Sequence, residues 1–120
     1  MNKPWPVIVA QYAECTERGA EMQAMLALVQ RIAGSQLAVG LFAWTSMFDL
    51  CITQTAVTYP YDGPYLKISP RQNGRIEFRY LDTRAEDKQW VRVVDPVDTI
   101  PRLLKFLHQL HWFPEGALNP

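Results

Sequence analysis

An Asn-Gly pair between two alternating runs is the feature that most restricts how this chain can fold. Residues 66–69 and 76–80 each alternate apolar and polar side chains, which is typical of strands with one buried face. Asn73-Gly74 lies between these runs, and the dipeptide favours tight hairpin turns because both residues tolerate positive φ. The sequence therefore predicts an antiparallel hairpin, and we expect the remaining elements to extend it or to cover it.

Three further segments are predicted strands, at residues 37–45, 50–59 and 88–94. The first is apolar on both faces, with Phe42 and Trp44 on one of them, so we expect it to be covered on both sides or to lie at an interface. In the last strand, Val91 and Val93 alternate with Trp90 and Arg92, and we expect the two valines to point toward the core. Residues 59–65 form an aromatic loop rich in turn-forming residues.

Two segments have the apolar periodicity of amphipathic helices. The first is residues 16–33, with Thr16 as its N-cap and Gly34 after its last residue. The second begins at Asp98 or Thr99, carries Pro101 in its first turn, and ends near residue 113. Residues 1–15 are expected to be either an edge strand or an extended arm, and residues 114–120 a tail.

This order of elements predicts an α+β fold made of a single domain over residues 1–120. Short connections favour an antiparallel meander, which gives a sheet of about five strands. One helix precedes the sheet and one follows it. We expect both helices to pack on one face of the sheet, which produces a two-layer sandwich.

Charge and cysteine content argue against several classes of protein. The chain has twelve basic and twelve acidic residues, and residues 65–92 carry seven basic and four acidic groups. This imbalance falls short of the basic stripe of a dedicated nucleic-acid binder. Two cysteines do not make a disulfide framework, and no apolar run has the length of a signal-peptide core or a membrane span. We therefore expect a soluble, cytoplasmic protein that does not contact membranes.

No group of residues carries a recognisable catalytic motif. His108 and His111 are three residues apart on the second helix, which is the start of a metal site, but no third ligand is evident. Cys51 lies in a predicted strand and is expected to be a small buried side chain, while Cys15 precedes a helix. We predict no catalytic residue, no metal site and no cofactor.

The best functional indication is a surface on the predicted sheet. The face opposite the helices should carry aromatic and basic side chains, which are the residue types that dominate protein–protein binding energy. We predict a binding site for a protein partner or a second copy of the chain, formed by Tyr61, Tyr65, Lys67, Arg79, Trp90 and Arg92. The sequence thus favours a non-enzymatic interaction module.

At the level of the fold, a small α+β chain without a chemistry motif resembles bacterial accessory proteins such as toxin-neutralising immunity proteins and secretion chaperones. That resemblance implies a protein partner. Two alternatives remain open. One is a small-molecule binder or enzyme with a pocket near His108, Trp112 and Tyr61; the other is a weak nucleic-acid binder that uses the basic hairpin at residues 65–92.

Overall fold

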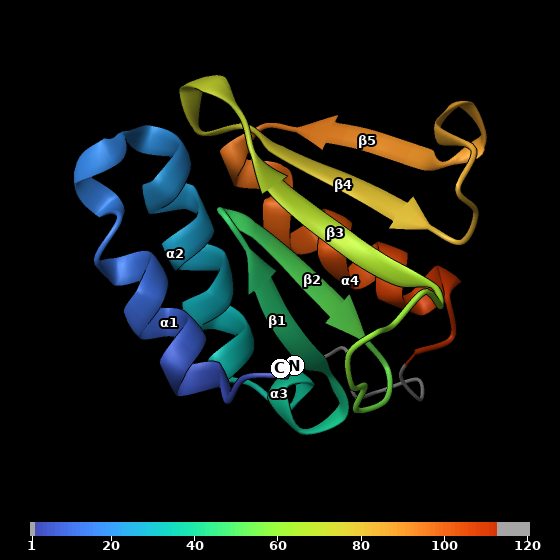
Figure 1. The fold of residues 1–120 in the computed structure, drawn as a ribbon. Coiled ribbons are helices and arrows are strands. Elements are labelled where there is room, and N and C mark those ends of the chain that lie inside the picture. Colours follow the sequence, from blue (N-terminus) through green and yellow to red (C-terminus); the bar gives the residue numbers. More distant parts are fainter. Residues whose placement is uncertain (1, 113–120) are drawn as a thin grey trace.

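The computed structural model describes residues 2–112, which form one antiparallel sheet with helices before and after it (Figure 1). The strands follow one another as a meander in the order β1-β2-β3-β4-β5. The strands are β1 Phe42–Ser46, β2 Asp49–Thr53, β3 Tyr65–Pro70, β4 Ile76–Leu81 and β5 Trp90–Val94. The helices of four or more residues are α1 Trp5–Ala13, α2 Ala20–Ala33, α3 Leu37–Gly40 and α4 Thr99–Gln109. The predicted α+β sandwich is confirmed.

The hydrophobic core lies between the sheet and the helices. One cluster of buried side chains contains residues from α1, α2 and α4 together with the inward residues of the strands. Along the strands the inward side chains are Ala43, Leu50, Ile52, Leu66, Ile68, Ile76 and Phe78. The helices therefore share one face of the sheet, and Figure 1 shows α4 behind the strands with α1 and α2 beside them. None of the helices found within residues 2–112 is long and apolar enough to cross a membrane.

The central hairpin forms where the Asn-Gly signal predicted it. β3 pairs with β4 from Tyr65↔Leu81 to Pro70↔Ile76, and the loop between them contains a short 3-10 turn at Gln72–Gly74. Asn73 has φ 61° and Gly74 has φ 75°, so both residues use the left-handed region. Gly74 is also buried, because the turn lies against Pro96 and the start of α2. The turn therefore joins the sheet to the helical layer.

The N-terminal prediction was wrong, because Trp5–Ala13 is a helix and not an edge strand or arm. Trp5, Ile8 and Tyr12 are buried at helical spacing, and Pro4 and Pro6 occupy positions at the helix start that need no N–H donor. The side chains also fasten the helix to the rest of the molecule: Trp5 Nε1 donates to the Leu41 carbonyl at 3.1 Å, and the Tyr12 hydroxyl donates to the Phe48 carbonyl at 2.9 Å.

Two other boundaries differ from the prediction. Gly19, at φ 134°, separates a 3-10 turn at Thr16–Arg18 from α2, so the long helix begins at Ala20 rather than at Thr16. The expected strand at residues 37–45 is helical over Leu37–Gly40 and extended only afterwards. Leu37 and Leu41 are both buried while Val39 is 84% exposed, so the spacing that suggested alternation belongs to one helical turn.

The remaining segments are shorter than expected. β2 ends at Thr53 instead of continuing to residue 59, and β5 starts at Trp90 after a 3-10 turn at Glu86–Lys88. The second predicted helix ends at Gln109, four residues before its expected end. The predicted tail at residues 114–120 lies outside the described residues.

Candidate interaction surface on the outer sheet face

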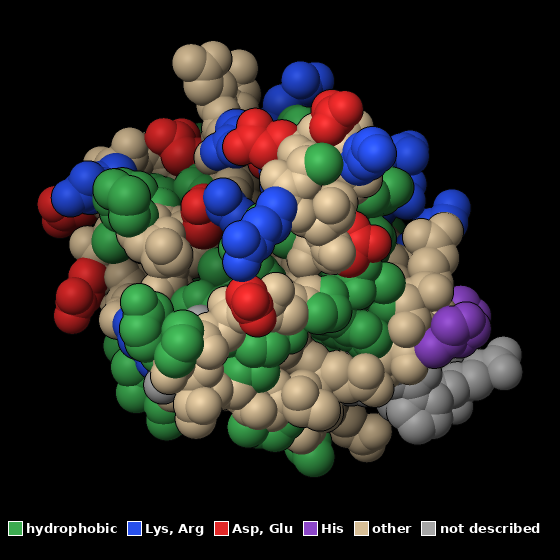
Figure 2. Space-filling view, turned by 45° about the vertical axis from the view of Figure 1, so that its right-hand side comes forward, with side chains coloured by type: hydrophobic (Ala, Val, Ile, Leu, Met, Phe, Trp, Pro, Cys, Tyr) green, Lys and Arg blue, Asp and Glu red, His purple; other side chains and the backbone are tan. Residues whose placement is uncertain are grey.

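Within residues 2–112, no helix covers the second face of the sheet, which we call the outer face. The strand registers determine which side chains share it. Trp44 pairs with Cys51, Cys51 with Lys67, and Lys67 with Arg79, so one row of outward side chains crosses four strands. Figure 2 gives an oblique view in which basic and acidic groups are interspersed with hydrophobic ones, so this side of the molecule carries no large field of one sign.

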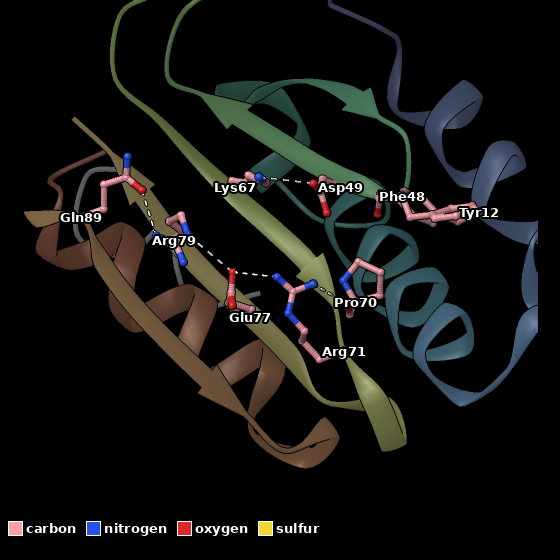
Figure 3. A network of polar contacts seen from close by, with 9 residues as sticks. All are labelled: Tyr12, Phe48, Asp49, Lys67, Pro70, Arg71, Glu77, Arg79 and Gln89. Carbon is pink, nitrogen blue, oxygen red and sulfur yellow. Dashed lines mark hydrogen bonds and ion pairs between the residues drawn. The ribbon is translucent and has the colours of Figure 1, made fainter. Parts of the chain in front are cut away.

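A buried carboxylate organises the charges on the outer face (Figure 3). Glu77 is 9% exposed although it lies on the side without helices, because the arginines beside it cover it. Its Oε2 accepts a hydrogen bond from Arg71 Nη2 at 3.1 Å and lies 3.6 Å from Arg79 Nε. A carboxylate with two guanidinium partners holds both in fixed positions.

The network continues from Arg79 into the connector before β5. Arg79 Nη1 donates to Gln89 Oε1 at 3.0 Å, and Gln89 Nε2 donates to the Thr83 carbonyl at 2.9 Å. Arg79 is thus held from two sides, with a side-chain exposure of 26%. A long side chain that is fixed before binding loses less conformational entropy when a partner contacts it.

Three aromatic side chains form the other half of the outer face. The Trp44 ring lies 5.4 Å from the Tyr65 ring and 6.1 Å from the Tyr61 ring, the latter in an edge-to-face arrangement. The Tyr61 hydroxyl donates to the Pro64 carbonyl at 2.7 Å, which holds the 59–65 loop against the sheet. Burial raises the pKa of Tyr65 and of Tyr61, so both phenols are neutral near pH 7. The loop and the strands therefore build one continuous aromatic surface.

Cys51 lies under this surface and is unsuited to nucleophilic chemistry. It is 3% exposed, and burial, assisted by Asp49 and opposed by Lys67, raises the pKa of its thiol to about 12. A reactive thiol needs a lowered pKa and access to substrate. Lys67 Nζ instead lies 3.5 Å from Asp49 Oδ2, so the cation above Cys51 is already paired.

The predicted orientation of β5 was wrong. Trp90 pairs with Tyr80 and Arg92 with Phe78, so both lie on the helix side of the sheet. The Trp90 ring lies 4.4 Å from the Phe106 ring of α4, while Val91 and Val93 are 40% and 47% exposed on the other side. Of the six predicted binding residues, the structure brings together Tyr61, Tyr65, Lys67 and Arg79, and separates Trp90 and Arg92 from them.

No family model, no curated protein and no solved structure matches this chain. What the protein can bind is therefore inferred from the geometry of its own residues.

The residues named for the other two hypotheses are not arranged as those hypotheses require. Trp112 packs edge-on against Tyr80, and His108 and His111 are exposed, whereas Tyr61 contacts Trp44. The cleft beside Tyr61, about 420 Å³, is lined by residues of the 61–65 and 81–89 segments and by neither His108 nor Trp112. Among residues 2–112, no three His, Cys, Asp or Glu side chains lie close enough to hold a metal ion.

The basic residues of the hairpin are largely neutralised by carboxylates. Arg71 and Arg79 contact Glu77, Lys67 contacts Asp49, and the remaining hairpin arginine, Arg75, contacts Asp95 at 3.1 Å. A nucleic-acid surface leaves its cations free for phosphate groups. This pairing favours a protein partner over a polyanion.

Four members of the surface and its network were not among the sequence-predicted binding residues: Trp44, Arg71, Glu77 and Gln89. Trp44 shares the face of Lys67 because of the β1–β2 and β2–β3 registers, which no local signal specifies. Gln89 orients Arg79 from a connector that sequence patterns describe only as charged. For Trp44, the one available indication in the sequence was that Phe42 and Trp44 alternate with the small side chain of Ala43.

Proposed function

We propose that this protein is a non-enzymatic interaction module that binds a partner protein through the outer face and the 59–65 loop. The observation that carries the proposal is the continuous surface of Trp44, Tyr61, Tyr65 and Arg79 on a face that no helix in residues 2–112 covers. Aromatic residues and arginine dominate binding energy in protein interfaces.

The charges support a partner that is neither strongly acidic nor strongly basic. Each cation on the outer face already has a carboxylate beside it, so the binding energy would come from aromatic contacts and from the remaining donors of Arg71 and Arg79. Such a surface fits another protein, as in immunity proteins and secretion chaperones, or a second copy of this chain. The two free cysteines are compatible with a reducing compartment, so we place the protein in the cytoplasm within this proposal.

The test compares outer-face variants with a matched surface variant. Trp44→Ala, Tyr61→Ala and Lys67→Ala are each expected to weaken association, because each removes a contact from the proposed surface. Lys88→Ala removes an exposed lysine from the 3-10 turn before β5, outside the row that crosses the strands, and is the control. Association is measured by sedimentation for the homodimer and by affinity capture from a lysate of the source organism for a different partner.

The proposal requires a difference between these variants that does not come from unfolding. Thermal midpoints measured on the same samples show whether each variant is folded. A strict monomer that captures no partner would refute the proposal, and so would capture that the three outer-face variants leave unchanged. Tyr61→Ala is the most informative of them, because its ring lies in a loop and not in a strand.

A further inference from the structure

The two edge strands of the sheet, β1 and β5, differ in whether their outer backbone groups have a hydrogen-bond partner. At β1 the Lys3 N–H donates to the Ala43 carbonyl at 2.8 Å, so the N-terminal segment bonds to that edge at one position. At β5 no backbone group within residues 2–112, other than those of β4, bonds to the strand. Figure 1 shows β5 as the outermost strand, with nothing beyond it in the plane of the sheet. An open edge strand is a template for one more strand.

The register shows which groups the open edge presents. Along an antiparallel strand, the backbone N–H and C=O groups of successive residues point alternately toward the strand on one side and toward the strand on the other. Because the Ala43 carbonyl bonds to Lys3, the backbone N–H and C=O of Ala43 point away from β2. When this alternation is followed through the strand registers, the N–H and C=O of Phe78 point toward β5. Phe78 therefore bonds to Arg92, and the backbone groups of Val91 and Val93 point away from the sheet. The Arg71 N–H to Arg75 carbonyl bond, at 2.8 Å, leads to the same assignment.

A basic groove runs beside this edge on the helix side, between β5 and α4. It has a volume of about 420 Å³. Its charged lining residues are Arg75, Arg92, Asp95, Asp98, Arg102 and Lys105. Arg75 is paired with Asp95, whereas Arg92, Arg102 and Lys105 form no ion pair with any carboxylate in residues 2–112. The four basic and two acidic groups leave the groove with a formal charge of +2.

We propose that β5 accepts an extended acidic peptide of a partner protein as a sixth strand. Side chains of a strand alternate between faces, so every second residue of the peptide enters the groove and every other one lies over the exposed Val91 and Val93. The groove selects carboxylates through Arg92, Arg102 and Lys105, and the valines select apolar side chains. The expected ligand therefore alternates acidic and apolar residues over about five positions, the length of β5.

Charge argues against a second copy of the chain at this edge. A two-fold axis through β5 places Arg92, Arg102 and Lys105 of one protomer near the same three residues of the other, and like charges in a shared interface are repulsive. An acidic strand would instead be attracted by these three basic residues. Val91 and Val93 lie on the outer face, but the groove and the open backbone of β5 lie apart from Trp44, Tyr61 and Tyr65, so the inference does not rest on the function proposed above.

The test uses a fluorescein-labelled, blocked octapeptide that alternates Glu and Val, with anisotropy measured at low salt. A peptide with Lys in place of each Glu is expected to bind at least about 10-fold more weakly, because it reverses every groove contact. The Arg102→Glu/Lys105→Glu variant is expected to lose about 10-fold for the Glu peptide, whereas Arg31→Ala, which removes an exposed arginine from α2, leaves the affinity unchanged. Affinity should also fall as salt is raised.

Two blocking experiments test the strand geometry. Val91→Pro deletes an N–H that points away from β4, so it blocks the edge without removing a bond from the sheet. A peptide N-methylated at alternate residues blocks the same pairing and leaves the protein untouched. Both are expected to abolish binding.

Several results would overturn the proposal. These are no binding at low salt, equal binding of the N-methylated peptide, and displacement of the peptide by an oligonucleotide of equal charge at similar concentration. A dimer that Val91→Pro dissociates would assign the edge to a second copy instead.

Discussion

Removing Glu77 tests whether the outer-face network depends on burial rather than on the short contact alone. Two carboxylates accept a hydrogen bond from an arginine at 3.1 Å, Glu77 from Arg71 and Asp95 from Arg75. The Glu77 side chain is 11% exposed and the Asp95 side chain 60%. The pairs therefore match in distance and differ in access to water.

The two substitutions are therefore expected to lower the free energy of unfolding by different amounts. Breaking a fully buried pair costs about 3–5 kcal/mol, and because the Arg71 and Arg79 side chains remain 46% and 26% exposed, we expect about 2 kcal/mol for Glu77→Ala. An exposed pair contributes about 0.5 kcal/mol, which is the expectation for Asp95→Ala. With a urea m-value of about 2 kcal/mol/M, the unfolding midpoint should fall by about 1 M for the first variant and about 0.25 M for the second.

Urea unfolding followed by tryptophan fluorescence measures both variants under the same conditions. Added salt should shrink the Asp95→Ala difference and leave most of the Glu77→Ala difference, because buried pairs are screened less. Equal midpoint shifts for the two variants, or a Glu77→Ala shift that salt removes, would refute the reasoning. In either case Arg79 would not be held in place by Glu77.

Three further predictions concern other parts of the fold. Trp90→Ala should cost about 2–3 kcal/mol in thermal unfolding, because it removes a ring packed 4.4 Å from Phe106; a loss below about 0.5 kcal/mol would contradict that packing. Gly74→Ala should cost about 1–2 kcal/mol, because φ is 75° and the new Cβ would lie 3.0 Å from Pro96 Cγ; an unchanged melting temperature would show that the turn can shift. Burial raises the pKa of Cys51 to about 12 from an ordinary 9.0, so its stabilising effect is complete below pH 9 and is lost as the pH rises toward 12. The decline in urea midpoint between about pH 8 and pH 10.5 should therefore be smaller in Cys51→Ala, and equal declines would oppose this assignment.

The parts of the fold that the sequence predicts correctly depend on local signals. Asn73-Gly74 places the turn because its conformational demand is met by those two residues alone. The stripes of α2 and α4 place their buried faces because helical periodicity repeats over three turns or more. The meander follows from short connections. None of these inferences needs to know which strand lies beside which helix.

The N-terminal helix was missed because two signals conflict there. Val7-Ile8-Val9 is a β-branched run that favours a strand, whereas Trp5, Ile8 and Tyr12 have the spacing of one helical face. Packing against α2 and the side-chain bonds to Leu41 and Phe48 decide in favour of the helix. Tertiary contacts of this kind override local propensity and have no counterpart in the sequence pattern.

The orientation of β5 follows from a comparison of buried area. A one-residue change in register exchanges the faces of the whole strand, so either Trp90 or the pair Val91 and Val93 must face the helices. A tryptophan ring buries about 150–250 Å² and finds an aromatic partner in Phe106, which favours the observed arrangement. The cost is two exposed valines on an open edge. An exposed apolar edge favours pairing with another chain, and this is the property that the proposed peptide strand would use.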